Sequence, residues 1–257
     1  MPYYHVKDTK LFIDDEGKGV PIIFLHPAGM GRKVFSYQKE LAKQFRVIMP
    51  DLSGCGDSEN PSYIKYGLLS TYAEELVELL NVLGIEKVIL CSYSCGGTVA
   101  QQFCLLYPER VKGLILTGGF PIVNTKPLQW EHLLGLHFIK KSPSFVSNVI
   151  SLAHTRDRAF QNELLQHMKK ANPSVWHQFY VESYRFNIVH DLHQFSWPIL
   201  AMYGARYDIT SHYHHYYDEL TSDVFFIHDA FHELPTLNWR QVNLLITGFI
   251  YKHGLQE

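Results

Sequence analysis

Short, continuous runs of apolar residues recur along the chain, separated by longer stretches of mixed polarity. The runs lie at 22–25, 45–49, 88–90, 114–116, 199–202 and 224–227. Because apolar residues do not alternate with polar ones in them, they are typical of parallel strands covered on both faces. Two earlier segments, 3–6 and 10–14, flank a polar turn and predict an opening hairpin. Together these segments predict eight strands.

Stretches between the runs have the period of a helix. Thr71-x-x-Glu74 has the form of a capping box, and Gly84 marks a stop after an apolar face made of Leu76, Leu79, Leu80 and Leu83. The segment 96–107 is apolar nearly all round and ends before a proline, which predicts a buried helix. The segment 238–252 predicts a closing helix. Strands that alternate with helices indicate a doubly wound α/β fold with a mostly parallel sheet.

One connection is far longer than the others. Roughly eighty residues separate the runs at 114–116 and 199–202, whereas a βα connection usually takes about 2–6. This stretch is rich in helix formers, aromatic residues and histidines. We therefore predict a core domain made of 1–119 and 192–257, with a helical cap, 120–191, inserted after the sixth strand.

The segment Cys91-Ser92-Tyr93-Ser94-Cys95-Gly96-Gly97 joins a buried strand to the predicted helix at 96–107. A serine on such a tight turn holds its hydroxyl exposed, and the first N–H groups of the helix point at whatever the hydroxyl attacks. Two adjacent glycines are costly in a helix and indicate close backbone packing. We interpret Ser94 as a nucleophile, which needs a base within hydrogen-bond reach.

Three more segments follow strand ends and can complete this chemistry. After the strand at 22–25, His26-Pro27-Ala28-Gly29 leaves backbone N–H groups free, so Ala28 and Cys95 N–H are the candidate oxyanion hole. Asp208 follows the strand at 199–202 and can orient a histidine. After the last strand His228 and His232 compete as general base, and we favour His232 because it lies farther into the loop.

The order Ser94, Asp208, His232 resembles that of the α/β-hydrolase family. The segment 49–58, MPDLSGCGDS, is similar to the D-x-x-G-x-G-x-S loop of that family, and 107–116, YPERVKGLIL, resembles its Y-P-E-R-V-x-x-L-I-L signature. Ser92 departs from the family elbow, G-x-S-x-G, at its first position. The resemblance covers about 20–118 and 197–250 but not the cap.

The resemblance implies a serine hydrolase that forms an acyl-enzyme on Ser94 and needs no cofactor. Small to medium carboxylic esters are the expected substrates of such a carboxylesterase. A carbon–carbon bond hydrolase or a lactonase uses the same triad, and a signal receptor with little turnover keeps the same fold, so these alternatives stay open. An arginine of the cap facing Ser94 favours a substrate that carries a carboxylate; the candidates are Arg156, Arg158 and Arg185.

Aromatic residues and histidines of the cap, together with residues near the elbow, are candidates to line the substrate pocket. We expect the pocket to include His26, Tyr93, Trp130, His137 and Phe138. Such side chains make an apolar, aromatic cavity suited to a small acyl or alcohol group.

Composition narrows the choice of partners. The formal net charge of −2 and the lack of a basic cluster give no reason to expect nucleic acid, and no run of residues is long enough to span a membrane. The four cysteines have no secretory context and are interpreted as reduced thiols of a cytoplasmic protein. No metal is expected, because neither the pair Cys91 and Cys95 nor the group His212, His214 and His215 has a further clustered ligand. A monomer or a homodimer acting on a small acyl substrate is the expected form.

Overall fold

The computed structural model describes residues 3–218, 220 and 222–256 of the 257-residue chain. Its centre is one eight-stranded sheet with the strand order β1-β2-β4-β3-β5-β6-β7-β8. The first three strands in this order pair antiparallel, and all pairs from β4 to β8 are parallel. The strands are β1 (Tyr3–Val6), β2 (Thr9–Glu16), β3 (Pro21–Leu25), β4 (Arg46–Pro50), β5 (Val88–Tyr93), β6 (Val111–Thr117), β7 (Ile199–Gly204) and β8 (Ser222–Ile227). The predicted hairpin, strands and mostly parallel sheet are confirmed.

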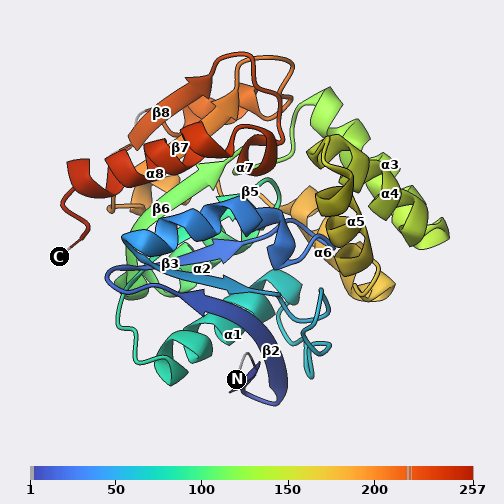
Figure 1. The fold of residues 1–257 in the computed structure, drawn as a ribbon, viewed down its shortest axis with the longest axis horizontal. Coiled ribbons are helices and arrows are strands. Elements are labelled where there is room, and N and C mark those ends of the chain that lie inside the picture. Colours follow the sequence, from blue (N-terminus) through green and yellow to red (C-terminus); the bar gives the residue numbers. More distant parts are fainter. Residues whose placement is uncertain (1–2, 219, 221, 257) are drawn as a thin grey trace.

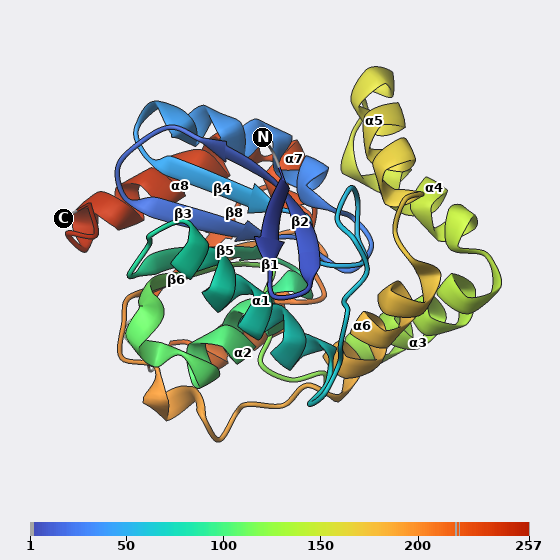
Figure 2. The same cartoon turned by 90° about the horizontal axis from the view of Figure 1, so that it is seen from below.

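Helices cover both faces of this sheet, which is the doubly wound arrangement (Figure 2). On one face α1 (Leu68–Val82) packs against α2 (Gly96–Leu106). On the other face α8 (Trp239–Lys252) packs against the 3-10 segment η1 (Arg32–Lys43). Shorter elements join them: η2 (Pro108–Arg110), η3 (Leu192–Gln194), η4 (Ser211–Tyr216) and α7 (Leu234–Leu237). In the described part of the chain, no helix has the length and apolar character that crossing a bilayer requires.

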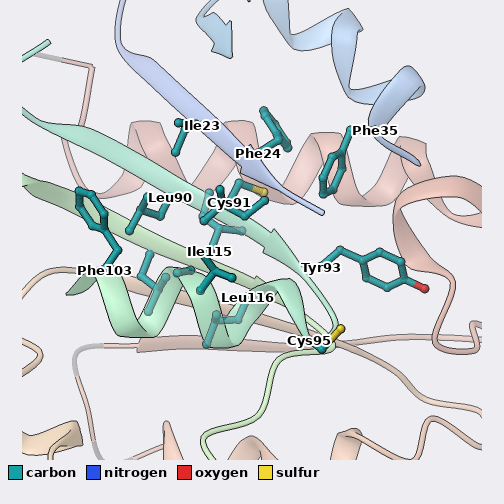
Figure 3. Packing of buried hydrophobic residues seen from close by; sticks show 14 of the residues in the cluster. Ile23, Phe24, Phe35, Leu90, Cys91, Tyr93, Cys95, Phe103, Ile115 and Leu116 are labelled. Carbon is teal, nitrogen blue, oxygen red and sulfur yellow. The ribbon is translucent and has the colours of Figure 1, made fainter. Parts of the chain in front are cut away.

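The central strands are buried along almost their whole length, as expected for continuous apolar runs. Every residue of β5 and β7 is buried, and Figure 3 shows side chains of β3, β5, β6 and α2 packed in this core. The strand β8 differs, because Phe225 and Phe226 are 43% and 48% exposed. It lies at the edge of the sheet, so the prediction that its run is covered on both faces is wrong.

Four helices lie between β6 and β7, at one side of the sheet, in the stretch for which a helical cap is predicted (Figure 1). They are α3 (Lys126–Lys141), α4 (Pro143–His154), α5 (Arg158–Met168) and α6 (Pro173–Arg185). An antiparallel bridge between Ile122 and Asn187 brings the two ends of this excursion together. The chain therefore leaves the core and returns to it at nearly the same place.

The start of α1 corrects the predicted capping box. The helix begins at Leu68, so Thr71 lies inside it and its hydroxyl donates to the Gly67 carbonyl at 3.0 Å. The acceptors for the first N–H groups of α1 come instead from Glu182 on α6, whose carboxylate accepts hydrogen bonds from the Leu68 and Leu69 N–H groups at 2.7 and 3.0 Å. A carboxylate at a helix N-terminus satisfies free donors and complements the helix dipole.

Candidate active site

Ser94 occupies a strained turn between β5 and α2. Its φ of 51° lies in the left-handed region that side chains other than glycine rarely adopt. Hydrogen bonds from Ser94 N–H to the Thr117 carbonyl and from Gly97 N–H to the Ser94 carbonyl, both 2.8 Å, hold it there. A Cβ on Gly96 would lie 2.3 Å from the Leu25 carbonyl oxygen, so only glycine allows α2 to start this close to β3.

The off-pattern serine of the elbow lies beneath this turn. Ser92 is fully buried, and its hydroxyl donates to the Ile115 carbonyl on β6 at 3.2 Å. It therefore satisfies its own polar group across the sheet. Ser92 is not among the residues that line the cavity beside Ser94.

The structure brings Ser94, His232 and Asp208 into one hydrogen-bonded chain. The distance from His232 Nε2 to Ser94 Oγ is 2.8 Å, and that from His232 Nδ1 to Asp208 Oδ1 is 3.1 Å. A Cβ on Gly118 would lie 2.5 Å from His232 Cε1, so the glycine leaves room for the imidazole. The competing histidine, His228, has a side chain that is 91% exposed and lies beside Asp229.

Asp208 is held as a carboxylate by several donors. Its oxygens accept hydrogen bonds from the Gly204 and Thr210 N–H groups, each at 2.9 Å, and from the Thr210 hydroxyl at 2.6 Å. Burial would raise the pKa of Asp208, but the charge and hydrogen bond of His232, together with these donors, lower it to about 2.

The interaction between Asp208 and His232 raises the pKa of the histidine, whereas it lowers that of the aspartate. Burial alone would lower the pKa of His232, but the Asp208 charge and hydrogen bond, with the nearby charges of Glu233 and Glu131, raise it above its ordinary value. An imidazolium that forms at His232 is therefore stabilised by a fixed carboxylate.

The candidate oxyanion donors lie where the sequence places them, but one is already engaged. Both Ala28 and Cys95 line the cavity beside Ser94. The Ala28 N–H donates to Cys95 Sγ at 3.4 Å, so the prediction that this N–H is free is wrong. Burial raises the pKa of Cys95 to about 12, which keeps the sulfur as a neutral thiol and hence a weak acceptor. A developing oxyanion is a much stronger acceptor for the same N–H.

A cavity of about 330 Å³ opens onto the Ser94 hydroxyl. Its lining combines apolar residues of the core loops and the cap with a few polar groups. The lining residues are Pro27, Ala28, Met30, Tyr93, Ser94, Cys95, Leu128, Glu131, Val149, Ile150, Ala153, His154, Tyr180, Tyr207, Ile209, Thr210, His232 and Glu233. Two carboxylates are among them, and no lysine or arginine is, within the described part of the chain.

Of the five predicted pocket residues, the structure places only Tyr93 in this lining. His26 is fully buried and supports the loop, because its Nδ1 lies 2.8 Å from the Pro27 carbonyl and its Nε2 accepts the Leu52 N–H at 3.0 Å. Burial lowers the pKa of His26 to about 4, so it is neutral. Trp130, His137 and Phe138 lie on the outward side of α3 and are exposed.

Sequence reasoning missed a polar pair in the lining of the cavity, Tyr93 and His154. The Tyr93 hydroxyl lies 2.9 Å from His154 Nε2, and His154 Nδ1 lies 2.8 Å from the Ile150 carbonyl. Because Nδ1 donates to that carbonyl, Nε2 accepts from the tyrosine. Burial lowers the pKa of His154 to about 4 and keeps it neutral. No local pattern points to this partner, because His154 lies at the end of α4, outside every motif of the sequence.

One further cluster has the composition of a metal site. Ligand atoms of Asp51, Asp57 and His167 lie within 4.8 Å of one another. The Arg32 guanidinium lies among them and forms ion pairs with both carboxylates, and Lys170 binds Asp57 at 2.6 Å. These cations neutralise the carboxylates, so the donor set fits a link between the core and α5 better than a metal ion.

Comparisons with known proteins agree with this architecture. A family model described as alpha/beta hydrolase fold matches residues 20–235. A 2-hydroxymuconate semialdehyde hydrolase from Pseudomonas sp. is 34% identical over 128 residues, which are 47% of this chain and 45% of that protein. The chain thus spans less than half the length of this curated relative.

Solved structures resemble the whole chain. An esterase from Thermogutta terrifontis superposes with a TM-score of 0.81 and 24% identity, covering 98% of each chain. An enol-lactonase from Burkholderia xenovorans superposes with a TM-score of 0.83 and 15% identity, covering 97% of this chain and all of the other. At this level of identity the likeness concerns the fold.

Proposed function

The chain belongs to the α/β-hydrolase fold family, and from this premise we propose that it is a serine hydrolase that cleaves small to medium carboxylic esters. The observation that carries the proposal is the hydrogen-bonded triad of Ser94, His232 and Asp208, whose first two members line a mostly apolar cavity. This triad supplies a nucleophile, a base and the group that orients the base.

In the first half of the reaction, Ser94 Oγ attacks the ester carbonyl carbon while His232 Nε2 takes its proton. The carbonyl oxygen becomes an oxyanion and accepts hydrogen bonds from the N–H groups of Ala28 and Cys95. The oxyanion thereby replaces the Cys95 thiol as the acceptor for the Ala28 N–H. When the tetrahedral intermediate collapses, the bond from carbon to the alkoxy oxygen breaks. His232 returns the proton to that oxygen, so an alcohol leaves and the acyl group stays on Ser94.

In the second half, water replaces the alcohol. His232 takes a proton from the water as its oxygen attacks the acyl carbon, and the same N–H groups hold the second oxyanion. Collapse breaks the bond to Ser94 Oγ, which receives the proton from His232. A carboxylic acid leaves, Ser94 is restored, and no cofactor takes part.

The charges of the cavity support neutral substrates. Glu131 and Glu233 line it, and the cap arginines that would favour a carboxylate-bearing substrate, Arg156, Arg158 and Arg185, do not. A carboxylate brought near these side chains meets like charges without a compensating cation. This disfavours a carbon–carbon hydrolase of an anionic substrate, whereas a lactone, as a neutral cyclic ester, fits the same site.

The proposal is tested with p-nitrophenyl butyrate and the Ser94→Ala variant. Wild type should turn over many times, and the variant should lose activity by at least about 10³-fold, as expected when a covalent nucleophile is removed. Equal activity in the two proteins contradicts the proposal. A single burst without further turnover instead favours a receptor-like protein.

A matched ester tests the charge argument. Monomethyl succinate and methyl butyrate have similar lengths, but only the former ends in a carboxylate. With acid release followed in a pH-stat, kcat/KM for monomethyl succinate should be about tenfold or more below that for methyl butyrate, since about 1.4 kcal/mol of repulsion corresponds to a factor of ten. Glu131→Gln should recover part of the difference, and a lactone panel then separates linear from cyclic esters.

A further inference from the structure

Helices α3 and α4 expose an apolar face to solvent. On α3 the exposed residues recur at helical spacing, and α4 continues the pattern in the next helix. The members are Trp130, Leu133, Leu134 and Phe138 of α3 with Phe145, Val149 and Leu152 of α4, and their exposure runs from 38% to 64%. We call these seven residues the α3–α4 face.

The two stripes form one surface. The rings of Phe138 and Phe145 lie 5.5 Å apart between centroids, and the two helices pack against each other. Figures 1 and 2 both place α3 and α4 at the side of the molecule away from the sheet. The apolar side chains therefore face outward at the end of the cap.

The helix α4 places apolar side chains on the solvent side. Its fully buried residues are Ser147, Ser151 and His154, with Val146 and Ile150 partly buried against the core, whereas Phe145, Val149 and Leu152 are exposed. The hydroxyls of Ser147 and Ser151 are satisfied by backbone carbonyls of the same helix, at 3.0 Å each. Packing inside the cap thus does not account for the outward apolar residues, and a contiguous exposed patch of this kind marks an interaction site.

The border of the face is positively charged. Residues 126–156 carry four exposed cationic side chains, Lys126, Lys140, Lys141 and Arg156, and one carboxylate, Glu131, although the whole chain has a net charge of −2. In the part of the chain that the structure describes, none of the four cations forms an ion pair. The face therefore offers apolar insertion at its centre and free positive charge at its border.

The face leads directly to the cavity above Ser94. Val149 belongs to both, and Leu128 and Ile150 continue the lining inward from the same two helices. On the core side of the mouth, Tyr207 and Ile209 also line the cavity and are 87% and 38% exposed. Apolar surface is therefore continuous from the outside of the cap to the nucleophile.

We infer that the α3–α4 face docks on a lipid surface that carries anionic headgroups and sets the cavity mouth against it. Trp, Phe, Leu and Val side chains enter the boundary between headgroups and acyl chains, while Lys and Arg bind the anionic headgroups. A second copy of the chain is a poorer occupant, because a two-fold contact through this face would bring its cations toward like charges. The docking does not depend on the proposed ester hydrolysis.

Vesicle binding tests the inference. The full chain is sedimented with vesicles of phosphatidylcholine alone or of an equal mixture with phosphatidylglycerol. We expect it to bind the mixed vesicles, and to bind the neutral ones at least about tenfold more weakly. Of the four tryptophans, Trp130 is 64% exposed, Trp176 and Trp197 are buried, and Trp239 is half-buried on α8 away from this face, so brominated lipid should quench fluorescence chiefly from Trp130.

Variants at exposed positions separate the face from the rest of the surface. Leu134→Glu combined with Phe145→Glu should weaken binding to mixed vesicles at least about tenfold and leave hydrolysis of a water-soluble ester within about twofold, because neither residue lines the cavity. The control is Leu244→Glu on α8, which is 71% exposed and should bind as wild type does. Lys140→Gln with Lys141→Gln should reduce only the preference for anionic vesicles.

Three results would overturn the inference. The first is wild-type protein that binds neither kind of vesicle. The second is a double variant that binds mixed vesicles as well as wild type does. The third is a protein that ignores vesicles but forms a dimer in light scattering that the double variant loses, since this assigns the face to a second copy. Loss of the ester activity proposed above changes none of these readings.

Discussion

Replacing Asp208 by asparagine removes the negative charge from the hydrogen-bonded triad and keeps a side chain of the same size and shape at this position. The Asp208 side chain is fully buried, and its Oδ1 lies 3.1 Å from His232 Nδ1. At that distance and an effective dielectric constant of about 20, Coulomb's law gives about 5 kcal/mol for a carboxylate and an imidazolium. Since about 1.4 kcal/mol corresponds to a factor of ten, kcat/KM should fall by about 10³–10⁴.

The asparagine also changes the proton positions. The Gly204 N–H donates to Oδ2, whereas the Thr210 N–H and hydroxyl donate to Oδ1, the oxygen that contacts His232. Either orientation of an amide at this position therefore sets its NH₂ group against a backbone N–H. With the NH₂ at the Oδ1 position it also faces Nδ1 and favours the tautomer with the proton on Nε2, which cannot accept from Ser94.

The assay is kcat/KM for p-nitrophenyl butyrate across a pH series, with circular dichroism to verify the fold. The matched control is Asp218→Asn, because His214 Nδ1 and Asp218 Oδ2 lie 2.9 Å apart in an exposed aspartate–histidine pair. This control should change kcat/KM by less than about twofold, as expected of a surface pair. A folded Asp208→Asn protein that keeps a tenth or more of the wild-type kcat/KM would refute the reasoning.

Three further predictions concern other groups of the site and its support. The acidic limb of the kcat/KM profile should have a pKa above the ordinary histidine value, because Asp208 raises the pKa of His232. Glu233→Gln removes a second nearby charge and should move this limb to lower pH. A limb that Glu233→Gln leaves in place contradicts its assignment to His232. Cys95→Ala should keep or raise kcat by freeing the Ala28 N–H, whereas Cys95→Ser, which places a stronger acceptor there, should lower it; equal kcat values in the two variants argue against competition for this N–H. Glu182→Ala should lower the free energy of unfolding by about 1 kcal/mol, because the variant leaves the N-terminus of α1 without its cap. Calorimetry should show a fall in Tm of about 2–4 °C, and an unchanged Tm would show that the contact is unimportant.

The strands and the meeting of Ser94, Asp208 and His232 were predictable because the relevant signals are local. A continuous apolar run fixes a buried parallel strand, and residues just after such strands meet at one edge of the sheet. The edge position of β8, by contrast, depends on which strand comes last in the sheet, and its run is as apolar as the others.

The cap was predictable as a helical insertion but not in its detail. Helical spacing groups Trp130 and Phe138 on one side of α3, yet spacing does not say which side faces the core. The structure turns Leu128, His132 and Ile139 inward instead, so both aromatic residues leave the cavity. On α4 the fully buried residues are polar and apolar residues lie on both sides, so its pattern does not show which side faces the core.

His26 and Glu182 illustrate contacts that no local pattern encodes. The imidazole of His26 is held by Leu52, 26 residues away in the chain, and Glu182 of the cap completes a helix of the core at Leu68, 114 residues away. Such partners are set by the packing of the whole fold. Sequence spacing alone therefore assigned His26 to the pocket and the N-terminal cap of α1 to Thr71.

Covalent labelling of Ser94 tests the central claim most directly. The protein is treated with a fluorophosphonate, its intact mass is measured, and the modified residue is mapped by peptide mass spectrometry, with Ser94→Ala as the control. The account predicts a single adduct on Ser94, formed in step with the loss of ester hydrolysis and absent from the variant. An adduct on another residue, or full hydrolytic activity in a protein that carries the label on Ser94, would contradict it.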